Sequence, residues 1–131
     1  YKGQADDEAE RLLAQQNLDK RNNKIIADIR FIAQSLVSKQ CEITEAVLRI
    51  HYLADALDVD IMLQDQYSST HMHFLACKDM AIKEDYQDLP KKQRFQQDQQ
   101  RLRLEQSNES AVIAEAQLII NYAFVNLKKL H

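Results

Sequence analysis

The chain of 131 residues contains a single glycine and a single proline. Average usage would supply about nine glycines and about six prolines at this length. Sheet folds need many tight turns, and such turns depend on glycine and proline for backbone angles that other residues adopt poorly. These two counts therefore exclude sandwiches, barrels and doubly wound sheets. They predict an all-α chain with few, short connections.

The rest of the composition predicts a soluble globular domain. Hydrophobic residues make up 45% of the chain, which is too many for a disordered protein. The net charge of -3 gives no basic excess of the kind that indicates nucleic-acid binding. No apolar run approaches the roughly 20 residues that cross a bilayer. We expect residues 1–131 to form a single all-helical domain, with residues 1–22 as a candidate projecting helical extension.

The first two helices are predicted from apolar residues spaced three and four apart. The first covers about residues 5–39, with a weak point at Asn22-Asn23 and an apolar stripe at Ile25, Ile29, Ile32 and Leu36. The second covers about residues 44–57, with Thr44 as its expected cap. Its seam has the heptad spacing of nearly parallel helices and consists of Ile43, Val47, Ile50, Ala54, Leu57 and Ile61.

Two further helices complete the predicted architecture. The third follows the cap cluster Ser68-Ser69-Thr70 and covers about residues 71–85. The last begins near Pro90 and extends to Leu130, with a possible break at residues 107–110 and a strongly amphipathic part from Val112 onward. The prediction is a four-helix bundle-like fold, with long first and last helices and two shorter ones between them.

The polar segment that opens the second helix is the candidate functional patch. It consists of Gln40, Cys41, Glu42, Thr44, Glu45 and Arg49. Glu45 and Arg49 are four residues apart and so can pair on one helix face, while Glu42 and Glu45 are three apart. Two interpretations stay open. The segment is either a polar or metal site at a helix start, or a capping segment with a surface ion pair and one buried thiol.

Other sites that could carry chemistry have little support in the sequence. His73 and Cys77 are four residues apart on the predicted third helix, but a structural zinc site needs four ligands, and Cys41 and Glu45 would have to join them. The two cysteines are expected to be reduced and mostly buried, and His51 is expected to pack beside the core. Since no ExxH, GxxxxGK[ST], GxSxG or HExxH pattern occurs, we predict no catalytic residue, metal or cofactor.

A local basic stretch has two interpretations. It contains Lys91, Lys92, Arg94, Arg101 and Arg103, against Asp98 and Glu105. One interpretation is an electrostatic docking surface for RNA, an anionic lipid or an acidic partner. The other is an ordinary solvated helix face.

The segments Ile32-Ala33-Gln34, Gln40 to Glu45 and Arg49-Ile50, together with Arg101 to Glu105, resemble the proteobacterial domain of unknown function family DUF2489. The resemblance covers about residues 22–130, with Ala46 as a mild departure where a glycine is expected. It implies no activity, cofactor or catalytic residue. It does imply a soluble helical domain that often follows one membrane-spanning helix.

The expected function is that of a non-catalytic helical interaction or scaffold domain, the soluble part of a single-pass inner-membrane bacterial protein. It would lie on the cytoplasmic side, behind an anchor that precedes Tyr1, or otherwise in the cytoplasm. Expected partners are another protein or a second copy, with a homodimer through the amphipathic face of residues 112–130, and no nucleic acid. The alternative is a sensory ligand-binding helical bundle of a membrane receptor.

Overall fold

The computed structural model describes residues 2–57, 60–125 and 127. Its α-helices are α1 (Lys2–Val37), α2 (Ile43–Ala56), α3 (Ser68–Cys77), α4 (Lys83–Asp88) and α5 (Lys91–Ile120). Two short 3-10 turns, Ile61–Leu63 and Asp65–Tyr67, connect α2 to α3. No strand occurs in the described ranges, so the predicted all-α fold with long first and last helices is confirmed. None of the described helices combines the length and the apolarity that crossing a membrane would require.

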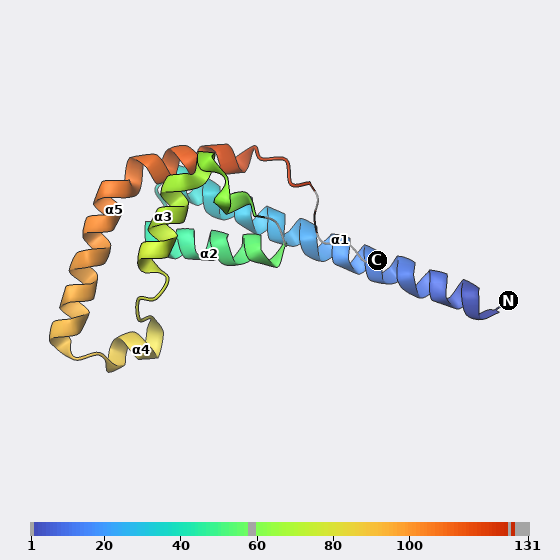
Figure 1. The fold of residues 1–131 in the computed structure, drawn as a ribbon, viewed down its shortest axis with the longest axis horizontal. Coiled ribbons are helices and arrows are strands. Elements are labelled where there is room, and N and C mark those ends of the chain that lie inside the picture. Colours follow the sequence, from blue (N-terminus) through green and yellow to red (C-terminus); the bar gives the residue numbers. More distant parts are fainter. Residues whose placement is uncertain (1, 58–59, 126, 128–131) are drawn as a thin grey trace.

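The core lies where the C-terminal halves of α1 and α5 meet α2 and α3 (Figure 1). The stripe predicted for the first helix faces this core, with Ile29 and Leu36 almost fully buried. The heptad seam predicted for the second helix is also confirmed, because Val47, Ile50 and Leu57 have no exposed surface. Burial of these aliphatic side chains is the main stabilising contribution to the fold.

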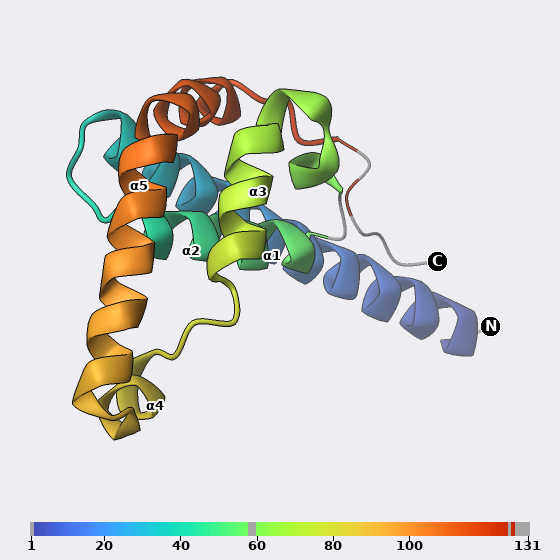
Figure 2. The same ribbon diagram turned by 60° about the vertical axis from the view of Figure 1, so that its left-hand side comes forward.

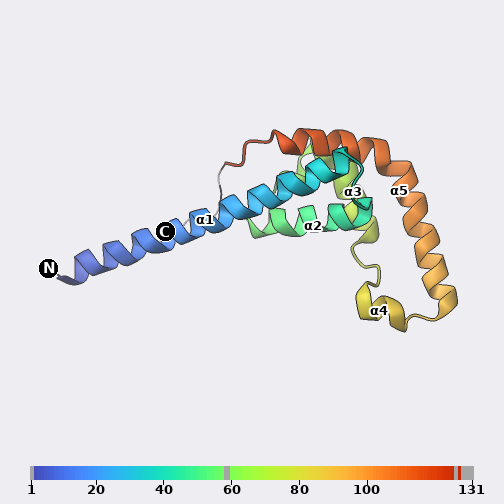
Figure 3. The ribbon, with the colours of Figure 1, turned by 180° about the vertical axis from the view of Figure 1, so that it is seen from behind.

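Helix α1 continues through Asn22-Asn23 without a break, so the predicted weak point is wrong. Asn22 is 3% exposed, and its side-chain oxygen accepts a hydrogen bond from Arg21. The part of α1 before this position extends away from the other described helices (Figures 1 and 3). All of residues 4–14 are exposed.

Helix α5 is continuous from Lys91 to Ile120, so the break expected at residues 107–110 does not occur. The helix bends instead. Its C-terminal half packs on the core, whereas its N-terminal half extends away from the core. Helix α4 lies next to the N-terminal end of α5 (Figure 2). Pro90 is the residue immediately before the helix, one position earlier than expected.

The third helix is shorter than predicted. It ends at Cys77, and the residues expected to continue it form an irregular segment followed by α4. The side chain of Gln97 on α5 explains part of this difference. Its Oε1 accepts a hydrogen bond from the Ala81 backbone N–H at 3.0 Å, and its Nε2 donates to the Ala81 carbonyl at 2.9 Å. This long-range pair replaces the backbone bonds that a helix would have made at Ala81.

The last helix also ends earlier than predicted, at Ile120 rather than Leu130, and residues 121–125 are not helical. Two of their side chains, Tyr122 and Phe124, still pack against the core. Arg30 holds this segment by donating a hydrogen bond to the Tyr122 carbonyl at 3.1 Å and by lying over the Phe124 ring. Leu130 lies outside the described residues. Val112, Ala116 and Ile119 of α5 are buried in this core, whereas Leu118 and Val125 are 51% and 60% exposed.

Candidate functional site

The six residues of the candidate patch do not lie in one environment. Thr44 is 7% exposed, whereas Gln40, Cys41, Glu42, Glu45 and Arg49 are exposed. In the part of the chain that the structure describes, Glu45 and Arg49 form no ion pair, although their spacing would allow one. Thr44 does not cap α2, because the helix begins at Ile43 and Glu42 occupies the N-cap position without a side-chain hydrogen bond.

Thr44 instead belongs to a buried polar network that joins three helices. Its Oγ1 lies 3.0 Å from Nε2 of His73 on α3 and 2.9 Å from Oε2 of Glu105 on α5. The other ring nitrogen of His73, Nδ1, lies 2.9 Å from the side-chain amide nitrogen of Asn108 on α5. Since the Asn108 amide donates to Nδ1, His73 carries its proton on Nε2 and donates it to Thr44. Thr44 in turn donates its hydroxyl proton to Glu105.

Burial keeps this network in one protonation state. His73 has no exposed surface, and desolvation lowers the pKa of its imidazole, while the nearby Glu105 carboxylate acts in the opposite direction. His73 is therefore neutral, as its hydrogen bonds require. The Cys77 thiol lies 3.7 Å from Nε2 of His73, and burial raises its pKa. The predicted proximity of His73 and Cys77 is confirmed, but the pair is a neutral thiol beside a neutral imidazole.

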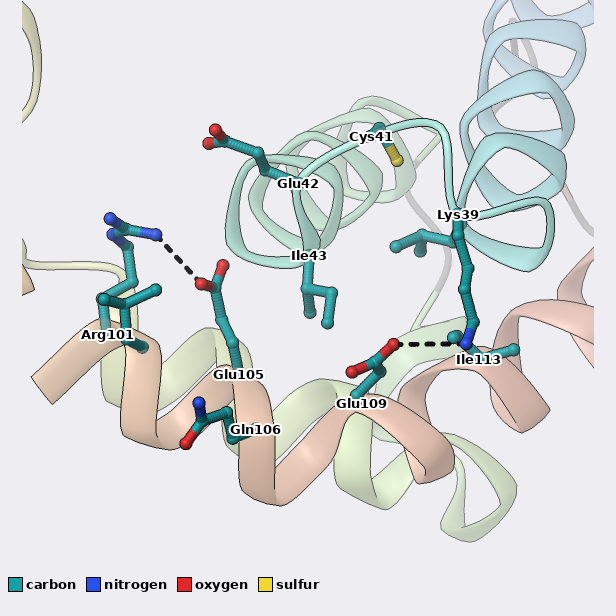
Figure 4. Close-up of a pocket in the computed structure, with 11 residues that line it drawn as sticks. Lys39, Cys41, Glu42, Ile43, Arg101, Glu105, Gln106, Glu109 and Ile113 are labelled. Atoms are coloured by element: carbon teal, nitrogen blue, oxygen red, sulfur yellow. Dashed lines mark hydrogen bonds and ion pairs between the residues drawn. The ribbon is translucent and has the colours of Figure 1, made fainter. Parts of the chain in front are cut away.

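Glu105 is the central anion of the network and acts as the missing cap of α2. Its Oε2 accepts the backbone N–H of Thr44 at 3.2 Å, and its Oε1 accepts a hydrogen bond from Arg101 at 2.9 Å. Figure 4 shows Glu105 rising from α5 toward the start of α2, at the wall of a cavity of about 480 Å³. A negative charge at this position also interacts favourably with the helix dipole of α2.

A second glutamate of α5 caps α3 in the same manner. Glu115 is 8% exposed, and its carboxylate accepts the backbone N–H groups of Ser69 at 3.1 Å and Thr70 at 2.8 Å. The predicted cap cluster Ser68-Ser69-Thr70 does mark the start of α3, but its side chains make no cap hydrogen bond. Both short core helices thus receive their caps from α5.

Replacing Glu115 with alanine is expected to lower the free energy of unfolding by about 2 kcal/mol, because two buried N–H groups lose a charged acceptor. Chemical denaturation monitored by circular dichroism measures the loss. Gln117, which is exposed on the same helix, provides the matched control, and its alanine variant should differ from the unmodified protein by less than about 0.5 kcal/mol. Equal losses for the two variants would contradict the capping role.

Four of the six patch residues line a groove of about 720 Å³. Its walls come from α2, the segment after α3, α4 and the N-terminal half of α5. Gln97 and Asp98 of α5 fix the outer wall, since Gln97 holds Ala81 and Asp98 accepts a hydrogen bond from the Tyr86 hydroxyl at 2.7 Å. The lining residues are Glu42, Thr44, Glu45, Leu48, Arg49, Tyr52, Cys77, Met80, Ala81, Ile82, Lys83, Tyr86, Gln97, Asp98 and Arg101.

All of the patch residues except Thr44 line a smaller cavity of about 470 Å³ between α1 and α2, and Gln40 and Cys41 line this cavity without lining the groove. Both cysteines are free, as expected, but Cys41 is exposed rather than buried. Of the four residues weighed as a metal or thiol site, the structure brings His73 and Cys77 together and leaves Cys41 and Glu45 apart from them at the surface. Within the described ranges, no group of three or more His, Cys, Asp and Glu side chains could hold a metal ion.

A stack of rings lies beside the groove. His51 is 5% exposed, and its ring lies 4.0 Å from that of Phe74 and 5.4 Å from that of His71. Its Nε2 is buried and has no hydrogen-bond partner. Desolvation, with a smaller contribution from His71, lowers the pKa of His51 to about 4. The sequence placed His51 correctly as a packing residue.

Sequence reasoning missed the α5 side of this site. The sequence indicates Arg101 and Glu105 only as members of a charged stretch that shares in the family resemblance, and Asn108 only as part of a possible helix break. One signal was present, since Arg101, Glu105 and Asn108 are spaced four and three apart and so share one helix face. The sequence does not indicate that this face meets Thr44 and His73.

The fold and site together define an all-α domain with an apolar groove at one end and a buried polar network behind it. A family model described as "Protein of unknown function (DUF2489)" matches residues 2–119, and the chain belongs to this family. The match includes the projecting part of α1, which the resemblance drawn from residues 22–130 left out. Neither the search of curated proteins nor that of solved structures finds a significant match.

Proposed function

We propose that this chain is a non-catalytic interaction domain that binds an amphipathic segment of a protein in the groove. One observation carries the proposal. Tyr52 and Ile82 line the groove and are 56% and 59% exposed. Large apolar side chains gathered on an exposed concave surface are typical of protein-binding sites.

The charges around the groove fit the same proposal. Glu45 and Arg49 on α2 and Lys83 on α4 line it, and none of them forms an ion pair among the described residues. A polar, charged border around an apolar floor supports specificity and register in protein recognition. The network behind the groove holds its thiol and imidazole neutral, which does not favour nucleophilic catalysis.

We also propose that the domain acts at the cytoplasmic side of the inner membrane, behind an anchor that precedes Tyr1. The support comes from the family resemblance and from the free, exposed thiol of Cys41, which suits a reducing compartment. The second candidate function is sensory binding of a small ligand. The groove volume supports it, since about 720 Å³ lies within the usual range of small-molecule pockets.

Site-specific photo-crosslinking in cells tests the interaction proposal. A photoreactive amino acid replaces Ile82 in the groove or, as a control, Leu63. Leu63 is 63% exposed and comes before α3 in the sequence, whereas Ile82 comes after it. We expect at least a tenfold higher yield of defined protein adducts from position 82. Equal yields from both positions would contradict a protein-binding groove, and a small molecule that raises the melting temperature of the purified chain would favour the sensory alternative.

A further inference from the structure

We infer that residues 78–90, the segment between α3 and α5 that contains α4, form a strap that opens and closes over the groove, with Gln97 as its latch. The inference rests on the proposed function, because it says how a bound segment gains access to the same groove. Three observations carry it. The strap has no buried residue, its side-chain hydrogen bonds to the rest of the molecule end at one place on α5, and its backbone is strained beside that place.

The strap is the least firmly held wall of the groove. It lines the groove with residues such as Ile82 and Tyr86, yet none of residues 78–90 is buried or packs against the core. Figures 1 and 2 show it leaving the end of α3 and passing through α4 to the start of α5, away from the core. The opposite wall, α2, is fixed by Val47 and Ile50, which have no exposed surface. Since a helix as short as α4 is not stable by itself, displacing the strap costs less than displacing α2.

Three side-chain hydrogen bonds join the strap to other parts of the described chain, and all three end on neighbouring residues of α5. Gln97 makes two of them with the backbone of Ala81, at 3.0 Å and 2.9 Å. Asp98 accepts the third from the Tyr86 hydroxyl at 2.7 Å. The remaining hydrogen bonds of the strap are backbone bonds between residues three or four positions apart. Breaking the contacts at this one place therefore frees the strap between its two ends.

Gln97 suits the role of a latch because a side-chain amide carries both a donor and an acceptor. Its Oε1 accepts the Ala81 N–H and its Nε2 donates to the Ala81 carbonyl, so both backbone groups of one strap residue are satisfied together. A glutamate has the same length and shape, but its carboxylate offers acceptors only. It would face the Ala81 carbonyl without a proton to donate.

The backbone next to this contact is strained. Lys83 begins α4 with a φ of 50°, in the left-handed region that is unfavourable for a residue with a Cβ atom. Such a conformation persists only where surrounding contacts hold it. The contacts of Ala81 with Gln97 lie two residues away. Release of Gln97 lets Lys83 relax, and this relaxation favours the open strap.

The groove has to widen before it can hold a protein segment. Its volume of about 720 Å³ is typical of a small-molecule pocket. A helix with its side chains is about 10 Å across, so that two turns fill roughly 850 Å³. With the strap closed, the groove accepts anchor side chains alone. Displacement of the strap makes room for the backbone of the bound segment.

Hydrogen exchange of the purified full chain, measured by mass spectrometry, tests the inference. Gln97→Glu should speed exchange of the amides of residues 79–89 at least tenfold, since the strap loses two hydrogen bonds. Tyr86→Phe, which removes the third bond, should speed it at least threefold. The exposed neighbour Gln96 gives the matched control, because Gln96→Glu adds the same charge and should change exchange less than about twofold.

Exchange in α2 separates opening of the strap from unfolding of the whole domain. In each variant the amides of α2 should exchange within about twofold of the unmodified rate, because the core stays folded. Equal acceleration in α2 and in the strap would show global unfolding, and no acceleration in the strap would show that Gln97 is not a latch. Either result would overturn the inference.

The Cys77 thiol gives an independent measurement at the floor of the groove. It lines the groove and is 1% exposed, and in chains that carry Cys41→Ser it is the one remaining thiol. We expect iodoacetamide to modify Cys77 at least fivefold faster in Gln97→Glu than in Gln96→Glu, because the open strap uncovers the floor. Equal rates of modification would contradict a strap that covers it.

Cellular photo-crosslinking connects the strap to the proposed function. A photoreactive amino acid replaces Tyr52, which lines the groove from α2. Gln97→Glu should raise the yield of protein adducts from position 52 at least threefold, because binding follows the fraction of open chains, and Gln96→Glu should not. An unchanged yield beside faster exchange of the strap would overturn the control of access. Equal crosslinks from positions 82 and 63 would remove the proposed function, while the exchange and iodoacetamide results on the strap would stand.

Discussion

Replacing Glu105 with alanine is expected to lower the free energy of unfolding by about 3 kcal/mol, because three donors lose one charged acceptor. These donors are the Thr44 backbone N–H, the Thr44 hydroxyl and the Arg101 guanidinium. The Glu105 side chain is 13% exposed, so water replaces it poorly. Urea denaturation followed by circular dichroism measures the change. Glu105→Gln, which keeps an acceptor oxygen but loses the charge, should fall between the unmodified protein and the alanine variant.

Glu109 provides the matched control for this prediction. It lies one turn further along α5, and its carboxylate forms a 3.7 Å ion pair with Lys39 (Figure 4). The two side chains are 44% and 70% exposed, so solvent screens their interaction. Glu109→Ala should change stability by less than about 0.5 kcal/mol. If both alanine variants lost the same stability, Glu105 would be an ordinary surface residue and not the cap of α2.

Acid is expected to destabilise the protein between pH 6.5 and pH 4, with His51 as one source of the loss. In the folded chain burial lowers the pKa of His51 to about 4, whereas in the unfolded chain the imidazole has its ordinary pKa of 6.5. The unfolded state therefore binds an extra proton in this interval, and stability falls as the pH falls. The difference corresponds to about 3 kcal/mol by pH 4. Burial lowers the pKa of His73 as well, which acts in the same direction.

The variant His51→Phe isolates the contribution of His51. A phenyl ring keeps the stacking on Phe74, does not titrate and removes a buried nitrogen that has no hydrogen-bond partner. Urea unfolding at a series of pH values gives stability curves for both proteins. Between pH 7 and pH 4 the unmodified protein should lose about 3 kcal/mol more stability than the variant, because only the unmodified protein carries His51. Parallel curves from pH 7 to pH 4 would show that His51 titrates alike in the folded and unfolded states.

Local and repetitive features of the fold were predictable from the sequence. Two residue counts gave the all-α class, and the spacing of Ile29, Ile50 and their neighbours gave the buried faces of α1 and α2. These predictions depend on helix periodicity alone. The apolar spacing of three and four residues is the same in α1 and α2 wherever the elements that pack against them lie.

The features that were missed depend on contacts between distant residues. Helix α3 ends before the Ala81 segment because the Gln97 side chain supplies that segment with a donor and an acceptor. The apolar spacing after Ile120 suits a helix, yet Tyr122 and Phe124 pack against the core from a non-helical segment held by Arg30. The local sequence does not distinguish a continued helix from a non-helical segment at either place, so a prediction from periodicity alone was wrong at both.

The candidate patch was located in part. The segment from Gln40 to Arg49 does border cavities, and Glu42 lines three of them. The sequence predicts interactions between residues that are close along the chain, such as an ion pair between Glu45 and Arg49. The structure assigns the hydrogen bonds to Thr44 and to residues about thirty and sixty positions away, His73 and Glu105. The capping side chain of a helix can come from any other element, and spacing along the chain does not indicate which one.

The caps that α5 supplies have a consequence for synthesis. A ribosome makes α2 and α3 well before Glu105 and Glu115 emerge, so both helices form at first with open N-terminal N–H groups. We expect these two helices to fray in a nascent chain that stops short of α5. Their starts become fixed together once the last helix docks. Docking of α5 therefore completes the core, and we expect a product truncated before Lys91 to leave the starts of α2 and α3 open to proteases.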